Sequence, residues 1–512
     1  MNGAILVEKL IRYAMLRLHL SEYDVEYMRN FLLSELKLTA PYDGEEDFSE
    51  IDKLAVPDLL IQELSEYAIE NGLTDEFGAE RFCANIFGSL SPLPSKLNDV
   101  FSDIKKKEGA QRACDYLYEL CVYNGYIQKT AIAKNLKWKF EDERNVLEIT
   151  VNLSKPEKNN KDIAKLLTAP QSKKYPMCAL CKENEGFEGT ATHPPRRNLR
   201  TIKFTLGGEK WFMQYSPYAY YDEHCIVINE SHTPMKVDAQ TPVKLLDFVD
   251  AMPNYFIGSN ASLPIIGGSI LNHEHFQGGR HKMPMHRAGY RKLFQSKKYP
   301  SLKIGILDWY NSALQCEGND RKEIELFMAD VINHWKDFSC EKCDIIAETN
   351  GVRHNSLSPI FRKEGDKYIV SAILRNNRTN EQYPDGIFHV HPEFLNIKSE
   401  GIGLIEAMGL FILPGRLKRQ LDKIEDVLCG KEKYDRNEFN KETSDLYVHR
   451  LMIENLISQG QAEDKETARN RVREYVNRVC ANILDNTAVF KRDKNGEDGF
   501  NEFMRGLELI EL

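Results

Sequence analysis

Residues 267–279 read Gly-Gly-Ser-Ile-Leu-Asn-His-Glu-His-Phe-Gln-Gly-Gly and set two histidines and a glutamine at alternate positions. Because side chains alternate between the two faces of a strand, an extended backbone would place His273, His275 and Gln277 on one face. Glycines on both sides let a ligand or a neighbouring backbone come close. The stretch therefore predicts a strand that presents two imidazoles and a primary amide to a common partner.

An imidazole suits the transfer of a phosphoryl or nucleotidyl group, because it attacks phosphorus while neutral and leaves readily afterwards. Such a nucleophile needs a partner that fixes its tautomer and a donor for the phosphate oxygens. Gln277 can donate without adding a second titrating group. A metal-binding pair and two packed core histidines are the alternatives. The glutamine and its four flanking glycines favour nucleotidyl transfer, with His275 as the nucleophile.

A Cys-x-x-Cys sequence, Cys178-Ala-Leu-Cys181, precedes this stretch. Two thiolates from one tight turn supply half of a tetrahedral zinc site. A redox pair is the alternative, but the surrounding sequence shows no thioredoxin-like βαβ pattern. The histidines available to complete a metal site are His193, His224, His232 and His273. A second pair, Cys340 and Cys343, stands among apolar residues and is interpreted as core packing.

A second His-x-His, His389-Val-His391, follows His354 in the sequence. Its alternation predicts another strand with two histidines on one face. A second metal site, a contact with substrate and a structural role are all open for these three histidines.

The hydrophobic pattern divides the chain into helical ends and a β-rich middle. Apolar residues recur every three or four positions through residues 4–37, and helical patterns continue to about residue 130. Short alternating runs predict strands at residues 145–153, 199–206, 211–215, 223–228, 265–275, 343–349, 360–361, 368–374 and 386–391. Residues 243–255 and most of 403–512 predict helices, so the expected fold class is α+β.

Length, charge and cysteine content bound the function. A chain of 512 residues is long for one core, and its net charge of -9 argues against a general nucleic-acid binder. We find no apolar run of about 18 residues, so no membrane span is expected. Glu8, Lys9 and Arg12 interrupt the first apolar pattern, which predicts an amphipathic helix rather than a signal peptide. Eleven scattered cysteines, an odd count, indicate a reducing compartment, and we expect the cytoplasm.

Five longer strings resemble the bacterial, type 2 galactose-1-phosphate uridylyltransferases. The central one is Asn-Ala-Ser-Leu-Pro-Ile-Ile-Gly-Gly-Ser-Ile-Leu-Asn-His-Glu-His-Phe-Gln-Gly-Gly at residues 260–279. The others lie at residues 147–157, 214–221, 388–395 and 403–416. The resemblance covers nearly the whole chain, and the strings are long enough to be specific.

The resemblance implies a ping-pong reaction of galactose metabolism, the Leloir pathway. His275 would attack the α-phosphorus of UDP-glucose, release glucose 1-phosphate and pass the UMP group to galactose 1-phosphate. Gln277 would bind the phosphate oxygens, and Asn260, Ser269 and Glu406 would contact the substrate. The alternatives are a histidine-triad nucleotide hydrolase or phosphorylase, and a zinc-stabilised nucleotide-sugar binding protein without turnover.

The resemblance also implies metal sites, because the related type 1 enzymes hold zinc with two cysteines and two histidines. Carried onto this chain, that structural zinc set is Cys178, Cys181, His232 and His273. A second metal in type 1 enzymes uses a glutamate and three histidines, whose counterparts here would be His354, His389 and His391, without an identified glutamate. The chain departs from the type 1 His-Pro-His-Gly-Gln at Glu274 and Phe276, and Ser262 stands where type 2 enzymes are expected to carry an acidic residue.

The architecture that the resemblance implies is a histidine-triad-like α+β fold of antiparallel or mixed sheets in two related halves. The expected regions are a helical N-terminal region (1–135), a first half with the nucleophile (136–295), a second half (296–402) and a helical C-terminal region (403–512). The expected partners are UDP-glucose and galactose 1-phosphate, with a homodimer as the assembly and neither nucleic acid nor a membrane.

Overall fold

The computed structural model describes residues 2–154, 175–190, 193–439 and 441–512, and the chain divides into two units. Unit 1 comprises Met1–Lys134 and Pro156–Thr233, and unit 2 comprises Asn135–Lys155 and Pro234–Leu512. The last three residues of the string at 147–157 lie outside the described residues. The chain thus enters unit 2 for one short segment, returns to unit 1, and completes unit 2 afterwards.

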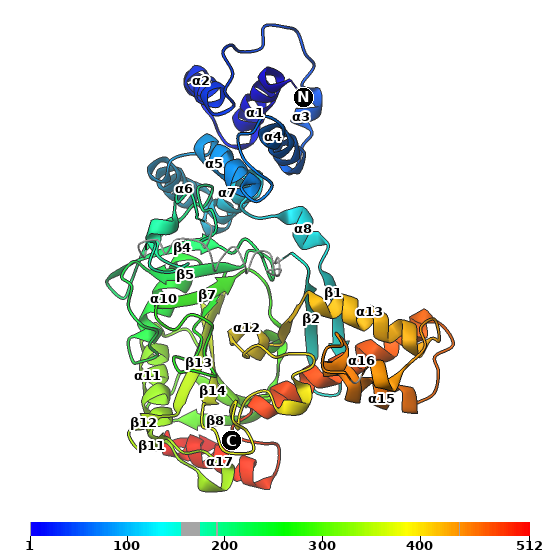
Figure 1. Ribbon diagram of the computed structural model, residues 1–512. Helices are drawn as coiled ribbons and strands as arrows, with labels where there is room; N and C mark the ends of the chain where they lie inside the picture. The colour runs from blue at the N-terminus through cyan, green and yellow to red at the C-terminus, as the bar shows by residue number, and fades with distance from the viewer. Residues whose placement is uncertain (1, 155–174, 191–192, 440) are drawn as a thin grey trace. The chain divides into compact units, whose positions relative to one another are not determined.

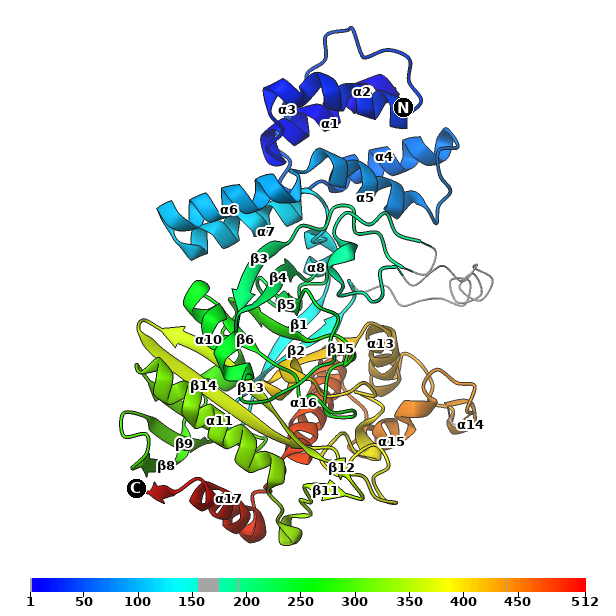
Figure 2. The same cartoon turned by 90° about the vertical axis from the view of Figure 1, so that its left-hand side faces the viewer.

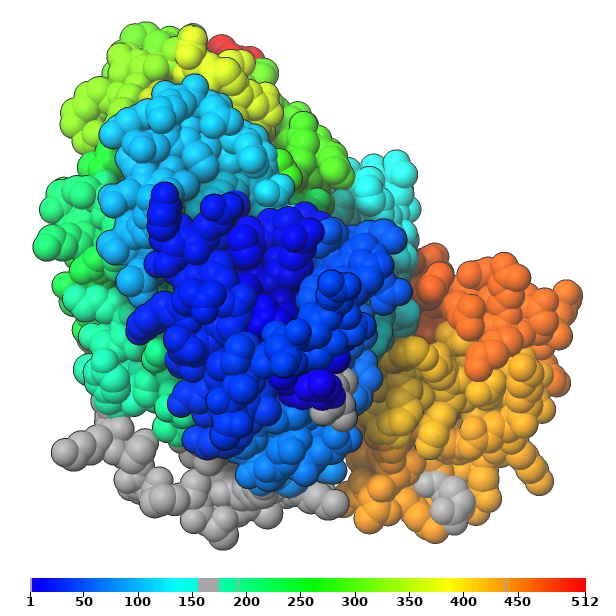
Figure 3. Space-filling view, turned by 90° about the horizontal axis from the view of Figure 1, so that it is seen from above, coloured from blue at the N-terminus to red at the C-terminus, as the bar shows by residue number. Residues whose placement is uncertain are grey.

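Helices form the first part of unit 1 and pack through apolar faces. They are α1 (Gly3–Arg17), α2 (Val25–Glu35), α3 (Ser49–Asp52), α4 (Asp58–Glu70), α5 (Ala79–Leu90), α6 (Pro94–Glu108), α7 (Ala110–Tyr123) and α8 (Lys129–Ala133). In α1 the side chains of Leu6, Leu10 and Ala14 are buried at four-residue spacing. The chain turns between α1 and α2, where His19 has a left-handed φ of 58°. Figure 3 looks onto this helical part, drawn in blue.

Three strands of unit 1 follow the helices: β3 (Ile202–Leu206), β4 (Glu209–Tyr215) and β5 (Cys225–Asn229). They pair antiparallel in that order, with Met213 of β4 opposite both Ile202 and Val227. Helix α6 packs on β3 (Figure 2). Tyr215 Oη donates to the carbonyl of Cys114 in α7 at 3.2 Å. The strands predicted at residues 199–206, 211–215 and 223–228 are confirmed with shifted ends.

In unit 2 the strands run in the order β16-β8-β9-β10-β14-β13-β6-β7, each antiparallel to its neighbour. Figure 1 labels β7, β8, β13 and β14 of this set. Their bounds are β6 (Phe256–Gly258), β7 (His275–Gly279), β8 (Tyr290–Ser296), β9 (Lys303–Leu307), β10 (Ala313–Gly318), β13 (Asn355–Glu364), β14 (Lys367–Asn376) and β16 (Leu509–Glu511). A two-stranded ribbon, β11 (Glu348–Thr349) and β12 (Val352–Arg353), stands apart from this order. The hairpin β13–β14 is the longest pair, and Gly365 makes its turn with a φ of 61°.

Two helices, α10 (Thr241–Ala251) and α11 (Arg321–Asp337), cover this sheet through contacts with β13. Figure 2 shows α11 lying along β13 and β14. Trp335 of α11 is 1% exposed, and its Nε1 donates to the carbonyls of Ser356 at 2.8 Å and Arg375 at 3.1 Å. These two bonds satisfy the buried indole N–H and fix α11 to both strands of the hairpin.

A second sheet of unit 2 combines distant parts of the sequence. Strand β1 (Leu136–Glu141) pairs antiparallel with β2 (Val146–Asn152), and β2 pairs in parallel with β15 (Leu410–Pro414). Helix α12 (Leu404–Ala407) leads directly into β15. The remaining helices are α13 (Arg416–Leu428), α14 (Arg436–Phe439), α15 (Arg450–Ser458), α16 (Lys465–Thr487) and α17 (Lys494–Gly506).

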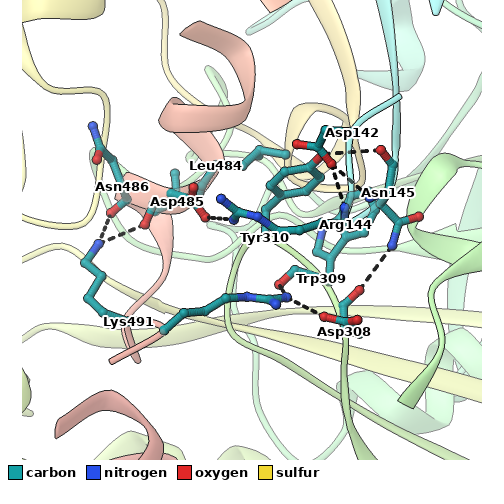
Figure 4. A network of polar contacts seen from close by, with 12 residues as sticks. Asp142, Arg144, Asn145, Asp308, Trp309, Tyr310, Leu484, Asp485, Asn486 and Lys491 are labelled. Carbon is teal, nitrogen blue, oxygen red and sulfur yellow. Dashed lines mark hydrogen bonds and ion pairs between the residues drawn. The ribbon is translucent and has the colours of Figure 1, made fainter. Parts of the chain in front are cut away.

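A polar network holds the turn between β1 and β2 in place (Figure 4). Tyr310 Oη donates to Asp142 Oδ1 at 2.7 Å, and the guanidinium of Arg144 pairs with Asp485 near the end of α16. Arg144 also lies over the Tyr310 ring, 5.0 Å from its centroid. Because β2 pairs with β15, this anchoring also fixes the strand that follows α12.

The observed fold is α+β with large antiparallel sheets, as the sequence predicts, but three predicted strands are wrong over most or all of their length. Within residues 343–349 only Glu348 and Thr349 are in a strand, because residues 341–343 form a 3-10 helix and Asp344 has a left-handed φ of 58°. Within residues 265–275 only His275 is in a strand, because Pro264 lacks an N–H donor and Ile265 has a φ of 73°. Residues 386–391 form turns, beginning at Gly386 with a φ of 116°. Within the described parts of the chain, no helix combines the length and hydropathy that a membrane crossing requires.

Candidate active site

Strand β7 carries the two central residues of the predicted site. Its partner β6 places Gly258 opposite Gln277 and Phe256 opposite Gly279. His275 and Gln277 occupy alternate positions, so their side chains leave the same face of β7. His273 precedes the strand, and its position does not follow from strand alternation as the sequence predicted.

The ring of His275 is held in one tautomer by its own backbone neighbourhood. Its Nδ1 lies 2.8 Å from the carbonyl oxygen of His273. A carbonyl only accepts, so Nδ1 carries the proton and Nε2 keeps its lone pair. The His275 backbone N–H donates to the sulfur of Met235 at 3.2 Å. The geometry therefore supplies a neutral imidazole with a defined nucleophilic nitrogen.

Burial favours the same neutral form. His275 is 6% exposed, and its burial lowers the pKa of the ring below the ordinary histidine value. The bond to the His273 carbonyl raises that pKa, and the neighbouring His273 ring lowers it. A group that attacks phosphorus must be unprotonated, so the net lowering suits a nucleophile.

Glu274, between the two histidines, forms a buried ion pair with Lys244 of α10. The ammonium nitrogen lies 3.0 Å from Oε1 and 3.3 Å from Oε2 of the carboxylate. The side chains of Lys244 and Glu274 are 3% and 1% exposed. Both charges are therefore withdrawn from water, and each compensates the other.

Asn260 and Glu406 are brought to neighbouring positions by the segment that leads into α12. Asn260 Oδ1 accepts the backbone N–H of Leu404 at 2.8 Å, and Glu406 Oε2 accepts that of Gly403 at 3.3 Å. The other oxygen of Glu406 accepts from Lys398 Nζ at 3.0 Å. Asn260 lies two residues after the last residue of β6, so both residues lie beyond the β6 end that pairs with Gln277.

Gly268 and Gly403 allow their backbones to lie close to the Asn260 side chain, because neither carries a Cβ. A Cβ on Gly268 would stand 2.8 Å from Asn260 Nδ2, and one on Gly403 would stand 3.2 Å from Asn260 Oδ1. Ser269, next to Gly268, is exposed. Ser262 donates its backbone N–H to Ser356 Oγ at 3.1 Å. The structure thus explains why the motif needs glycine at position 268.

The three histidines considered for a second metal site have separate partners. His354 Nδ1 lies 2.9 Å from Asn377 Oδ1, and the His391 ring stacks on Tyr383 with centroids 4.0 Å apart. His389 Nε2 accepts the Ile402 N–H at 3.3 Å. Over the described ranges, no group of metal-ligand side chains that could hold an ion includes these three residues.

Cys178, Cys181 and His232 form a cluster in unit 1 that could hold a metal ion. The two sulfurs are 3.5 Å apart, and Cys181 Sγ lies 3.1 Å from His232 Nδ1. Two thiolates bound tetrahedrally at about 2.3 Å from zinc stand about 3.8 Å apart, so the donors fit such an ion. His273, the fourth predicted ligand, belongs to unit 2, and its place in the set stays a prediction.

Sequence reasoning missed three cationic residues that the structure places near the predicted ones. Lys244 contacts Glu274, and Lys398 contacts Glu406. Arg375 donates from Nη2 to the Ile402 carbonyl at 3.0 Å. Arg375 is 1% exposed at the end of the apolar β14. The available signal for Arg375 was a charged residue near the end of an apolar strand. No signal in the sequence pointed to Lys244 or Lys398.

The arrangement can perform nucleophilic substitution at phosphorus. It combines a neutral imidazole with a fixed lone pair at His275, an amide two positions along the same strand face, and buried polar groups around Asn260 and Glu406.

Two family models match the chain. They are "Galactose-1-phosphate uridyl transferase, N-terminal domain" over residues 47–234 and "Galactose-1-phosphate uridyl transferase, C-terminal domain" over residues 248–439.

Bacterial galactose-1-phosphate uridylyltransferases are similar over almost the full length. The protein of Caldanaerobacter subterraneus subsp. tengcongensis is 43% identical, with 98% of each chain covered. That of Bacillus subtilis is 39% identical over 97% of this chain and 96% of its own. That of Ligilactobacillus salivarius is 36% identical with 100% of both chains covered. A solved DUF4931 family protein from Bacillus cereus is 13% identical, with a TM-score of 0.22 over 31% of this chain and 78% of its own.

Proposed function

The chain belongs to the galactose-1-phosphate uridylyltransferase family, and on this premise we propose that His275 carries UMP from UDP-glucose to galactose 1-phosphate. The observation that supports this role is the bond from His275 Nδ1 to the His273 carbonyl, which leaves Nε2 to attack. The product would be UDP-galactose, and the reaction belongs to galactose metabolism.

The two half-reactions balance around one bond to His275. Nε2 forms a bond to the α-phosphorus of UDP-glucose, while the bond from phosphorus to the bridging oxygen breaks and glucose 1-phosphate departs with the electron pair. A phosphate oxygen of galactose 1-phosphate then attacks the uridylyl-histidine, and Nε2 recovers its lone pair. Gln277 would donate to the phosphate oxygens in both steps, so one pocket serves both directions.

The substrate contacts follow from the polar groups beside β7. Asn260 and Ser269 would contact the nucleotide-sugar, and Glu406 would accept from sugar hydroxyls. The contacts from Lys398 and the Gly403 N–H to Glu406 orient its carboxylate for such a task. A carboxylate has further lone-pair positions, so these two bonds leave it able to accept more.

Zinc is the metal that best fits the donors Cys178, Cys181, His232 and His273, because two thiolates and two imidazoles form a common tetrahedral set. A zinc ion bound to four protein ligands has no open position, so its contribution would be structural. The proposed architecture is two related histidine-triad-like halves, the proposed assembly is a homodimer, and the proposed compartment is the cytoplasm.

Incubation with UDP-glucose alone is expected to give one burst of glucose 1-phosphate equal to the concentration of enzyme sites. The reaction then stops, because the UMP group stays on His275 until a sugar 1-phosphate accepts it. Quenched-flow measurement of released glucose 1-phosphate and free UMP checks this. Steady UMP production would instead indicate a hydrolase, and no release at all would indicate a binding protein.

The acceptor is tested on the same uridylylated enzyme. Addition of galactose 1-phosphate should discharge the UMP group as UDP-galactose, and a panel of other sugar 1-phosphates ranks the preference of the site. Discharge by inorganic phosphate alone would assign the chain to the phosphorylases.

A further inference from the structure

The segment that holds the His275 carbonyl partner is tied to a helix by charge. Glu274 follows His273 and precedes His275, and both carboxylate oxygens contact Lys244 Nζ, at 3.0 and 3.3 Å. Lys244 lies on α10, which packs on β6 and β13. The ion pair therefore connects the nucleophile's own backbone to a helix seated on the sheet.

The connection acts on the His275 ring through two short steps. The Glu274 carboxylate fixes the peptide that joins residues 273 and 274, and the carbonyl of that peptide is the acceptor for His275 Nδ1 at 2.8 Å. A shift of this peptide would move the acceptor and turn the ring with it. In-line attack on phosphorus tolerates little error, because a misplacement of about 1 Å can cost roughly 100-fold in rate.

The pair also removes a charge that would oppose the reaction. An uncompensated carboxylate next to His275 would repel the phosphates of a nucleotide-sugar. Lys244 neutralises it while both groups are almost fully buried, at 3% and 1% exposure of the side chains. An apolar pair of similar volume would supply packing at comparable or lower cost in free energy, so stability alone does not account for two buried charges.

We propose that Lys244 is a positioning residue for the uridylyl transfer: its ion pair with Glu274 sets the backbone that orients His275. The inference rests on the proposed function of His275. It concerns the rate of attack by Nε2 and not the affinity for either substrate.

The test compares Lys244→Met, Glu274→Leu and the double variant Lys244→Met with Glu274→Leu. Each single variant removes one charge of a buried pair, so both are expected to unfold at lower temperature than the wild type. The double variant removes both charges and should recover most of the loss. Its first-order rate of glucose 1-phosphate release at saturating UDP-glucose is nevertheless expected to stay roughly 100-fold below wild type, with KM for UDP-glucose changed less than about 3-fold.

A matched control perturbs α10 without reaching the histidine motif. Arg321 of α11 pairs with Asp247 and Asp250, which lie on α10 as Lys244 does, with N–O distances of 2.5 and 2.7 Å. Arg321→Met should leave the rate of glucose 1-phosphate release within about 2-fold of wild type, because these partly exposed pairs contribute little.

The ring itself gives a second readout. In uniformly ¹⁵N-labelled wild type, the imidazole spectrum of His275 is expected to report a proton on Nδ1, and in the folded double variant a mixture of tautomers. A double variant with wild-type stability, rate and tautomer would overturn the role of Lys244. A wild type that releases no glucose 1-phosphate would instead count against the proposed function.

Discussion

His275→Ala is expected to abolish uridylyl transfer while UDP-glucose still binds. The side chain supplies the only protein atom that bonds to phosphorus in the proposed mechanism, so both half-reactions are lost together. A loss on the order of 10⁶-fold in kcat is expected, the size reported when a covalent enzyme loses its nucleophile. Binding persists because the groups around Asn260 and Glu406 are held by backbone contacts and not by His275.

The measurement pairs steady-state transfer with calorimetric binding of UDP-glucose. His275→Gly is the companion variant, because the vacated volume can admit free imidazole, which should restore part of the activity in proportion to its concentration. Wild-type enzyme incubated with uracil-labelled UDP-glucose should retain label after denaturation and gel filtration at alkaline pH. Retained activity in His275→Ala, or the absence of label on the wild-type chain, would contradict the mechanism.

Cys178→Ser is expected to lower both metal content and stability. A hydroxyl is a much poorer zinc ligand than a thiolate, and a metal that binds only the folded chain stabilises it in proportion to its occupancy. Free metal at 1,000-fold its Kd contributes about 4 kcal/mol, and a loss of that order in the free energy of unfolding is expected. Metal analysis by mass spectrometry and chemical denaturation in defined zinc buffers measure both quantities.

Two further variants make the result specific. Cys343→Ser alters the other Cys-x-x-Cys and should leave the metal bound. The Sγ of Cys343 contacts the Asn495 carbonyl at 3.2 Å. His273→Asn tests the proposed fourth ligand and should lose metal as Cys178→Ser does. Full metal content in Cys178→Ser would contradict the zinc assignment. Full metal content in His273→Asn alone would exclude only His273 from the proposed set of zinc ligands.

The relative placement of the site residues could be predicted from sequence where they lie close together in the chain. His275 and Gln277 are two positions apart on β7, so strand alternation alone sets their relation. Cys178 and Cys181 also come from one short turn, and the structure places His232 beside them.

The partners that orient these residues could not be predicted, because they come from other elements. Lys244 is thirty positions before Glu274, on a helix whose apolar pattern gives a lysine no special place. Arg375 meets the Ile402 carbonyl only after the β13–β14 hairpin and the loop after it have folded. Side-chain contacts of this range depend on tertiary packing that local periodicity does not encode.

The predicted strands at residues 265–275 and 386–391 failed for a shared reason. Alternating polarity is produced by any segment that exposes every second residue, including irregular segments around glycine. Ile265 and Gly386 both take positive φ values, of 73° and 116°, which no regular strand contains. Pro264 and Gly386 are residues typical of turns, and they indicate an irregular backbone more strongly than the alternating polarity indicates a strand.

The parallel pairing of β2 with β15 has a consequence for synthesis on the ribosome. Strand β2 ends at Asn152 and β15 begins at Leu410, so about 260 residues must be added before the partner of β2 exists. At about 5–20 residues per second this takes roughly 13–50 s. During that interval one edge of β2 is unpaired and can pair with a strand of another chain. The nascent chain is therefore the form that depends most on a chaperone to prevent aggregation.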